Sequence, residues 1–398
     1  KGLYEKMNIS YDQFIQTSDK DKHWPGAIEM WKRLVAAGDI YKSTYTGLYC
    51  VSCETFYTDK DLIDGKCPIH LTVPEKIEEE NYFFKLSKYT EIIKEKIEKE
   101  EIKIVPQARK NEILALLSRG LDDVSFSRPK EKVPHAIPVP NDPTQIIYVW
   151  CDALVNYISA LGFGRKDDEL FTEFWPADVH VIGKDILRFH AALWPAMLLS
   201  AGLPLPKHIL VHGLITSGGH KMSKTLGNVI DPEDLILEYG SEAVRYFLAR
   251  EVSTFEDGDI TLEKFKESYN ANLANGLGNL ASRIMKMAES NLEGPVSIPE
   301  KSIPDEYFDL LNNFEIQKAA DYVWKEIGAM DLFIQENQPF KVVKSDPKAG
   351  KKMISELVVR LYSVARMLNP LLPETSKKIK ALVKENKMPS EPLFVRKD

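Results

Sequence analysis

The chain contains 398 residues, with 52 Lys and Arg against 59 Asp and Glu, and its formal net charge is −7. This length suggests two or three domains, and the 44% hydrophobic and 28% charged residues are typical of a soluble globular protein. The acidic balance excludes a wholly basic nucleic-acid binder, although a local basic patch could still bind RNA phosphates.

The predicted elements change character several times along the chain. Residues 1 to about 38 have helical spacing, with a break at Trp24-Pro25-Gly26. Residues 39–140 are turn-rich and strand-like, with one charged helix near 87–99 and a proline-rich end. From 141 to about 215, the β-rich runs 146–150, 179–182 and 208–211 alternate with helical stretches, which predicts a parallel α/β sheet. After about 262, apolar residues three and four apart predict a helical bundle, as in Leu273, Leu277 and Leu280.

Four residues in the turn-rich region have the spacing of a metal site. Cys50 and Cys53 form one pair, and Cys67 and His70 form a second pair after thirteen residues. Three thiolates and one imidazole suit Zn²⁺, and a full set of protein ligands predicts a structural rather than a catalytic ion. The alternative is a chance pairing of buried cysteines.

The cysteine cluster and the hydropathy of the chain together indicate in which cellular compartment the protein works. A thiolate cluster of this kind favours a reducing environment over a disulfide framework. The longest apolar stretch, residues 191–206, is too short to cross a bilayer, and no export leader is visible. We therefore expect a cytoplasmic protein that does not associate with a membrane.

A glycine-bordered loop carries two lysines, Lys221 and Lys224. Two ammonium groups three residues apart can face a polyphosphate, and in an adenylyl transfer they would stabilise the charge that builds up on the departing pyrophosphate. Behind the loop, Asp231 and Pro232 predict a helix start and Gly240 predicts its end. Without further context, two lysines in a loop are usually solvated surface residues.

The sequence of this loop resembles a known signature. Lys221-Met222-Ser223-Lys224-Thr225 is similar to the Lys-Met-Ser-Lys-Ser motif of class I aminoacyl-tRNA synthetases, with threonine for the last serine. The stretches 148–157 and 183–198 resemble the methionyl family, and the Arg-Gly-Trp-Phe stretch of the valyl, isoleucyl and leucyl families is absent there. The zinc pattern is similar to the one-zinc form of the same family. The resemblance covers essentially all 398 residues.

The resemblance implies an α/β fold with a Rossmann-type parallel sheet, of which only the second half is present, a zinc-binding connective insert and a C-terminal helical anticodon-binding bundle. The implied regions are 1–38 for the end of the first Rossmann half, 39–140 for the insert, 141–215 for the second half, 216–265 for the lysine loop and stem contact, and 266–398 for the bundle.

The resemblance also implies site residues for methionine and for ATP with Mg²⁺. The methionine pocket would be lined by Trp150, Leu154, Tyr157, Ile186, Phe189 and His190. ATP would be bound by Gly183, Asp185, Lys221, Ser223 and Lys224, with Lys221 and Lys224 as the catalytic pair. Aromatic rings suit a polarizable thioether. Without the motif, the aromatics would be ordinary core residues and His190 a structural histidine.

Three residues of the helical region would contact tRNA(Met). The stretch 275–283 resembles the anticodon-reading helix of the family, in which Asn279 and Arg283 share one face. Phe340 stands where some members have a tryptophan that stacks on an anticodon base, and phenylalanine could still stack. The alternative is a polar helix surface with a packed loop aromatic.

One expected motif is missing from the 398 residues. Members of the family carry a His-Ile-Gly-His-like motif in the first half of the nucleotide-binding fold, and nothing before the zinc pattern matches it. We therefore expect a methionine–tRNA ligase fragment that is inactive alone and needs an N-terminal half, supplied in the same chain or by a partner. The competing hypothesis is a non-catalytic RNA-binding zinc module derived from such an enzyme.

Overall fold

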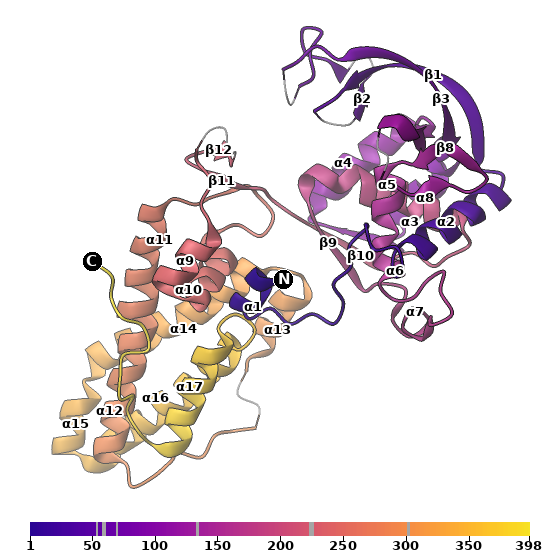
Figure 1. Cartoon of the computed structure of the whole chain (residues 1–398). Coiled ribbons are helices and arrows are strands. Elements are labelled where there is room, and N and C mark those ends of the chain that lie inside the picture. Colours follow the sequence, from indigo (N-terminus) through magenta and orange to yellow (C-terminus); the bar gives the residue numbers. More distant parts are fainter. Residues whose placement is uncertain (53–54, 58–60, 69–70, 133–134, 223–226, 301–302) are drawn as a thin grey trace. The chain divides into compact units, whose positions relative to one another are not determined.

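A computed structural model describes residues 1–398 except 53–54, 58–60, 69–70, 133–134, 223–226 and 301–302 (Figure 1). The chain divides into two compact units. The sheet unit consists of Tyr11–Val211. The helical unit consists of Lys1–Ser10 and His212–Asp398.

A small sheet lies inside the sheet unit, with strand order β4-β10-β9. The strands are β4 (Lys103–Val105), β9 (Val179–Gly183) and β10 (His208–His212), and β10 pairs with β4 in parallel. The helices α2 (Trp24–Ala36), α3 (Thr90–Glu98), α4 (Gln107–Ser118) and α8 (Trp194–Ser200) contribute buried residues to the same core as these strands. The prediction of an α/β fold with a parallel sheet is therefore confirmed.

A long antiparallel hairpin extends from this core (Figure 1). Strands β1 (Ile40–Cys50) and β3 (Glu75–Phe84) pair from Ile40 opposite Phe84 to Tyr49 opposite Glu75. The short strand β2 (Thr55–Tyr57) pairs with the far end of β1, and β5 (Val124–Ser125) pairs with the base of β3. We call the far end of this hairpin, residues 47–76, the arm tip.

A second antiparallel sheet leads into the helices that carry several predicted site residues. Its order is β6 (Ser127–Pro129), β8 (Asp142–Ile147) and β7 (Pro138–Val139). Directly after β8 come α5 (Val149–Leu154) and α6 (Asn156–Ser159), and α7 (Glu169–Phe174) follows. The described residues of this unit also form the short helices η2 (Leu86–Tyr89) and η3 (Lys130–Lys132), and two further short helices follow β9.

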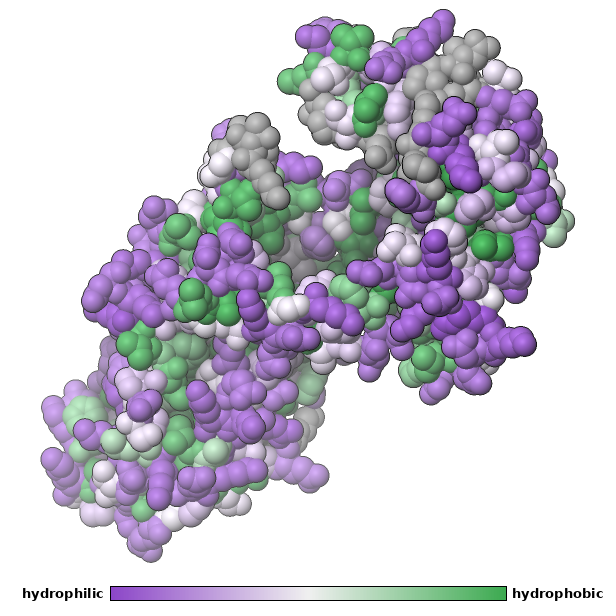
Figure 2. Space-filling view, in the orientation of Figure 1, coloured by the Kyte–Doolittle hydropathy of each residue, from purple (hydrophilic) through white to green (hydrophobic). Residues whose placement is uncertain are grey.

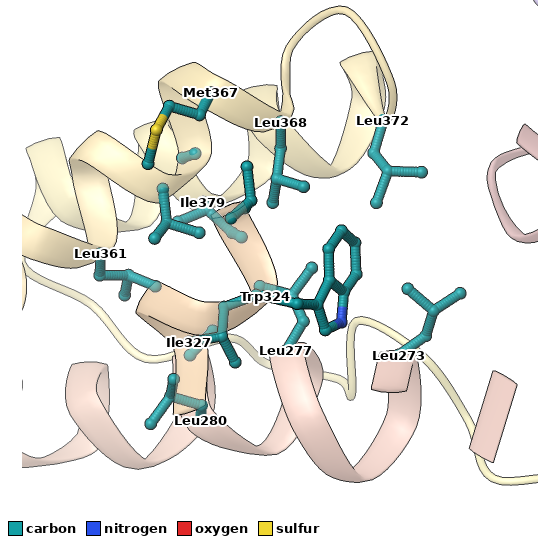
Figure 3. Packing of buried hydrophobic residues seen from close by; sticks show 14 of the residues in the cluster. Leu273, Leu277, Leu280, Trp324, Ile327, Leu361, Met367, Leu368, Leu372 and Ile379 are labelled. Carbon is teal, nitrogen blue, oxygen red and sulfur yellow. The ribbon is translucent and has the colours of Figure 1, made fainter. Parts of the chain in front are cut away.

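The helical unit is a bundle around one apolar core (Figure 3). Its elements in chain order are α1 (Gly2–Lys6), β11 (Ile215–Ser217), β12 (His220–Lys221), α9 (Pro232–Tyr239), α10 (Ser241–Tyr246), η6 (Phe247–Glu251), β13 (Gly258–Asp259), α11 (Leu262–Ser268), η7 (Tyr269–Gly278), α12 (Asn279–Asn291), α13 (Asp305–Asn312), α14 (Ile316–Asn337), α15 (Pro339–Ser345), α16 (Pro347–Leu368) and α17 (Pro373–Glu385). In Figure 3, Leu277 of η7, Ile327 of α14 and Leu368 of α16 point toward a common centre. The bundle predicted from apolar spacing is confirmed.

Three local predictions differ from the structure. Residues 7–23 form no helix, because Pro25 starts α2 in its first turn instead of interrupting a longer helix. The run 146–150 does not join the parallel sheet: β8 is antiparallel to its neighbours, and Val149 already begins α5. Helix α4 was not predicted, because its apolar residues cluster in its second half without a one-sided pattern.

The surface that Figure 2 shows is largely hydrophilic, with hydrophobic residues exposed singly and in small groups. Among the described helices, none has both the length and the apolar character needed to cross a bilayer.

Candidate functional site

A polar turn follows strand β9, at the edge of the described three-stranded sheet, at its carboxyl end. Gly183 ends the strand, the 3₁₀ turn η4 (Lys184–Ile186) follows, and a π-helical turn, η5 (Phe189–Leu193), continues into α8. Ligands of open α/β sheets bind beyond the carboxyl ends of the strands, and π-helical turns are frequent at functional sites. Asp185 is exposed here, beside the half-buried Gly183.

Two predicted pocket residues form a hydrogen-bonded pair across this turn. The Tyr157 hydroxyl lies 2.7 Å from Nε2 of His190, and Nδ1 of His190 lies 3.0 Å from the carbonyl oxygen of Ile186. A carbonyl can only accept, so Nδ1 carries the proton and, in the neutral ring, Nε2 accepts from the tyrosine. Burial lowers the pKa of His190 and raises the pKa of Tyr157, so both groups are neutral at pH 7.

The remaining predicted pocket residues lie around this pair. The rings of Trp150 and Phe189 are stacked, with centroids 3.7 Å apart and planes 8° apart. Both rings and Ile186 are partly buried against the core of the sheet unit, in which Leu154 is fully buried. The six predicted residues therefore belong to one apolar region, with the Tyr157–His190 pair as its polar part.

Sequence reasoning missed a third ring beside this pair, His180 of β9. Its centroid lies 4.2 Å from that of Tyr157, and its Nε2 accepts a 3.2 Å hydrogen bond from Nε1 of Trp194. Burial, with a smaller contribution from the nearby His190, lowers the pKa of His180 to about 4. A signal was present: strand alternation places His180 on the same face as the buried Ile182.

The lysine loop belongs to the helical unit and begins as a tight hairpin. Strands β11 and β12 pair through Ser217 opposite His220, with Gly218 and Gly219 between them at φ values of 62° and 77°. Positive φ at both central positions is the geometry of a type I′ turn and favours glycine. The two glycines therefore form a defined turn.

Two side chains hold this hairpin from outside. Oδ1 of Asp259 accepts from the N–H of Gly219 at 2.8 Å and from the hydroxyl of Thr216 at 2.9 Å. These bonds keep the pKa of Asp259 below its usual range, the Gly219 bond most of all. Nδ2 of Asn228 donates to the carbonyls of Ser217 and Lys221, each at 3.3 Å. Lys221 is exposed at the end of β12, whereas Ser223 and Lys224 lie outside the described residues. The predicted helix behind the loop is confirmed as α9, capped by Asp231 and ended by Gly240.

Two of the four predicted metal ligands are described, at the arm tip. Cys50 ends β1 and Cys67 follows the small turn that pairs Ile63 with Lys66, and both thiols are buried. Thr72 contacts both segments: its hydroxyl lies 3.8 Å from Sγ of Cys50, and its carbonyl accepts from the N–H of Cys67 at 2.8 Å. Cys53 and His70 lie outside the described residues, and within those residues no group of three potential ligands forms. Thr72 therefore links the two segments that carry the buried cysteines, an arrangement compatible with a shared ion.

The three predicted anticodon residues lie in the helical unit. Asn279 is exposed at the start of α12, and one turn later Arg283 forms an ion pair with Asp331 of α14. Phe340 is 43% exposed in the first turn of α15, after Gln338, whose φ is 46°. All three are accessible, which a contact with RNA bases requires.

Comparisons with known proteins agree along most of the chain. The family described as tRNA synthetases class I (M) matches residues 1–74 and 60–285. The methionine–tRNA ligase of Clostridium acetobutylicum is 42% identical over 396 residues, covering 96% of this chain and 61% of that protein. For the methionine–tRNA ligase of Mycobacterium bovis, the identity is 38% over 398 residues, covering 95% of this chain and 76% of that protein.

A solved structure shows the same agreement in three dimensions. Mycobacterium tuberculosis methionyl-tRNA synthetase in complex with methionyl-adenylate superposes with a TM-score of 0.87 at 36% sequence identity, covering 99% of this chain and 85% of that one. The chain spans about three fifths of the length of the clostridial relatives. Agreement of this extent in sequence and structure shows that the chain belongs to the methionyl family of class I tRNA synthetases.

Proposed function

We propose that this chain carries most of a methionine–tRNA ligase, which activates methionine with ATP to methionyl-adenylate and transfers it to tRNA(Met). The observation that carries the proposal is the neutral Tyr157–His190 pair and the stacked rings of Trp150 and Phe189, around the turn beyond the carboxyl end of β9. A structure 36% identical to this chain is described as a complex with methionyl-adenylate.

The pocket suits a thioether side chain. Methionine is uncharged and polarizable, and it packs well against aromatic faces such as that of Trp150. A neutral His190 adds no charge to the pocket, and its bond to Tyr157 fixes the direction of both rings. Selection of methionine would then depend on the shape of the pocket, which discriminates only modestly between near-isosteres.

The adenylate and the phosphates would be bound by two other groups of residues. Gly183 lets the backbone approach the nucleotide closely, and the exposed carboxylate of Asp185 can accept from ribose hydroxyls. Lys221 and Lys224, with the hydroxyl of Ser223, would bind the phosphates of ATP with its Mg²⁺. Two ammonium groups stabilise the charge on the departing pyrophosphate, so the lysines would act mainly in the transition state.

We further propose a structural Zn²⁺ at the arm tip, bound by Cys50, Cys53, Cys67 and His70. The ion would crosslink the two ends of a segment with little core of its own. Four protein ligands leave it no open coordination position, so its chemistry there is structural. The anticodon of tRNA(Met) would be recognised in the helical unit by Asn279, Arg283 and Phe340.

Methionine-dependent ATP–pyrophosphate exchange tests the proposal. We define the complemented chain as these 398 residues with a family-type N-terminal half supplied. Exchange by the complemented chain, with methionine and with no other amino acid, is the expected result. Exchange by the chain alone, measured in parallel, shows how much the supplied half contributes.

The second candidate function is a non-catalytic RNA-binding zinc module. The two candidates separate in one experiment. A folded, zinc-bound protein that binds tRNA but shows no exchange with any N-terminal half would support the module. Methionine-specific exchange would exclude it.

A further inference from the structure

A buried histidine outside the predicted site joins the two helices that carry the pocket aromatics. His23 immediately precedes α2 and is fully buried. Its Nε2 bonds the carboxylate of Asp152 on α5, and its Nδ1 lies 2.8 Å from the hydroxyl of Ser159 on α6. Since a carboxylate only accepts, Nε2 carries a proton and donates to Asp152.

Serine, histidine and aspartate are also the residue types of hydrolytic triads. Ser159 and His23 are both fully buried, however, so no substrate carbonyl can reach the serine oxygen. Only the Asp152 side chain is partly accessible, at 14% exposure. A nucleophilic role is therefore excluded, and the group acts inside the protein.

Helix geometry relates this group to the pocket. Residues two apart on a helix point in directions about 200° apart. On α5, Asp152 follows Trp150 by two residues, and on α6, Ser159 follows Tyr157 by two. The aromatic faces of both helices therefore point away from His23, while the opposite faces are bonded to it.

The surrounding packing leaves His23 little freedom. A Cβ on Gly26 would lie 2.8 Å from Cβ of Ser159, so α2 and α6 approach as closely as glycine allows. Nη1 of Arg165 donates to the carbonyls of Lys22 and Ser159, at 2.7 and 2.9 Å. The guanidinium of Arg165 thus fixes the backbone on both sides of the His23–Ser159 bond.

We propose that His23 is a positioning residue for the methionine pocket: by bonding Asp152 on α5 and Ser159 on α6, it sets the orientation of Trp150 and Tyr157. We call the two bonds that His23 makes to Asp152 and Ser159 the tether. The consequence for methionine binding rests on the proposed function, whereas the tether itself does not. Positioning shells of this kind hold pocket residues to fractions of an ångström, and small displacements cost large factors in rate or affinity.

The test uses two isosteric variants of the 398-residue chain labelled with 5-fluorotryptophan. His23→Gln places a donor where Nε2 was and keeps the Asp152 bond, whereas His23→Asn places its amide near Nδ1 and loses that bond. We expect His23→Asn to shift the fluorine resonance of Trp150, assigned with Trp150→Phe, and His23→Gln to leave it close to the parent position. Equal shifts in both variants, or none in either, would overturn the proposal.

A second variant tests the same proposal if the His23→Asn chain does not fold. Asp152→Ala cuts the same tether from the partly exposed side and should produce the same shift of the Trp150 resonance. When all three chains fold, the double variant should add nothing further, because both substitutions break one connection. Additive shifts would mean that the two residues act separately and would contradict the proposal.

Asp39→Asn is the matched control. Asp39 is 1% exposed and bonds Lys88, Tyr89 and Ser200, none of which belongs to α5 or α6. It should lower stability without moving the Trp150 resonance. In the complemented chain, His23→Asn should raise the KM for methionine about tenfold with a smaller change in kcat. If the parent shows no exchange at all, the proposed function fails, and the fluorine spectra still decide the tether.

Discussion

The hydroxyl of Tyr157 donates a 2.7 Å hydrogen bond to Nε2 of His190, whose other nitrogen bonds the carbonyl of Ile186. The hydroxyl proton of Tyr157 therefore points to Nε2 of His190, and the proton of His190 stays on Nδ1. A second proton on His190 would occupy Nε2 and remove the acceptor that the tyrosine uses. The pair is therefore stable as a neutral unit, in keeping with the lowered pKa of the histidine.

Tyr157→Phe should weaken methionine binding in the complemented chain. The variant removes the donor and leaves a buried nitrogen of His190 without it, which costs about 1–3 kcal/mol of stability. The KM for methionine should rise on the order of tenfold, while kcat falls less, because the lysine loop is untouched. Steady-state pyrophosphate exchange measures both constants.

Tyr307→Phe is the control for that substitution. Tyr307 is buried in the helical unit and donates a 2.6 Å bond to the carbonyl of Met367. Its loss should lower stability by a similar amount and leave the KM for methionine unchanged. An equal rise in KM in both variants would show that Tyr157 acts only through stability.

The lowered pKa of His180 should make the stability of the sheet unit depend on pH. Its pKa is about 4 in the folded chain and about 6.5 when unfolded, so between these values the unfolded state binds the extra proton. The unfolding free energy is therefore undiminished by this group above about pH 6.5 and falls as the pH drops toward 4, by up to about 3 kcal/mol. The lowered pKa of His190 acts in the same direction.

Urea unfolding at pH 7 and pH 4.5, followed by tryptophan fluorescence, measures this effect. Trp324 is the one tryptophan outside the sheet unit, so the signal reports mainly on that unit. His180→Gln keeps an acceptor for Trp194 but cannot be protonated. The variant should lose less stability between the two pH values than the parent, and an equal loss would contradict the assignment.

The helical bundle could be predicted from sequence because its signal is local. Leu273, Leu277 and Leu280 recur with the period of one helix face and are buried as that period requires. The end of α9 at Gly240 and its start at Asp231 also follow from local chemistry. In each case the residues that decide the structure are neighbours along the chain.

The sheet and the pocket pairings were less predictable because their partners are remote. Strand β4 is only three residues long, too short to show a period, yet it is the parallel partner of β10 about a hundred residues later. Likewise, nothing near His23 in the sequence indicates that Asp152 and Ser159 are its partners. Only His180 carried a local signal, its position on the buried face of β9.

The zinc proposal predicts one ion per chain, measurable by atomic absorption on purified protein. Cys50→Ser should abolish binding and make the arm tip sensitive to protease, because the metal replaces a core there. Cys151→Ser is the control, since Cys151 is a fully buried thiol of α5, remote in sequence from the arm tip, with a pKa raised by burial. Zinc retained in Cys50→Ser, or lost in Cys151→Ser, would contradict the ligand set.

The lysine loop predicts a loss of rate rather than of binding. Lys221→Ala and Lys224→Ala should each lower kcat of pyrophosphate exchange about a hundredfold, with little change in the KM for methionine. Asp259→Ala should give a smaller loss, because it only releases the hairpin that presents Lys221. Lys318→Ala, an exposed lysine of the same unit paired with Glu315, should have no effect. A matching loss in Lys318→Ala would assign the effect to charge in general.

Substitutions in two arginine ion pairs of the bundle can distinguish a role in tRNA recognition from a role in packing. Arg283 pairs with Asp331 and Arg360 with Glu326; both acidic partners lie on α14, and all four side chains are 35–37% exposed. Exposed pairs of this kind contribute at most about 1 kcal/mol, so either arginine can be replaced without unfolding the bundle.

Arg283→Ala should weaken tRNA(Met) binding about tenfold, the size of one lost base contact, whereas Arg360→Ala should leave it unchanged. Filter binding at fixed salt with tRNA(Met) and with an anticodon-substituted tRNA measures this, and the Arg283→Ala chain should distinguish the two RNAs less strongly than the parent does. Equal weakening by both substitutions would show that bundle charge, not base recognition, determines the affinity, because only Arg283 lies on the helix that resembles the anticodon reader.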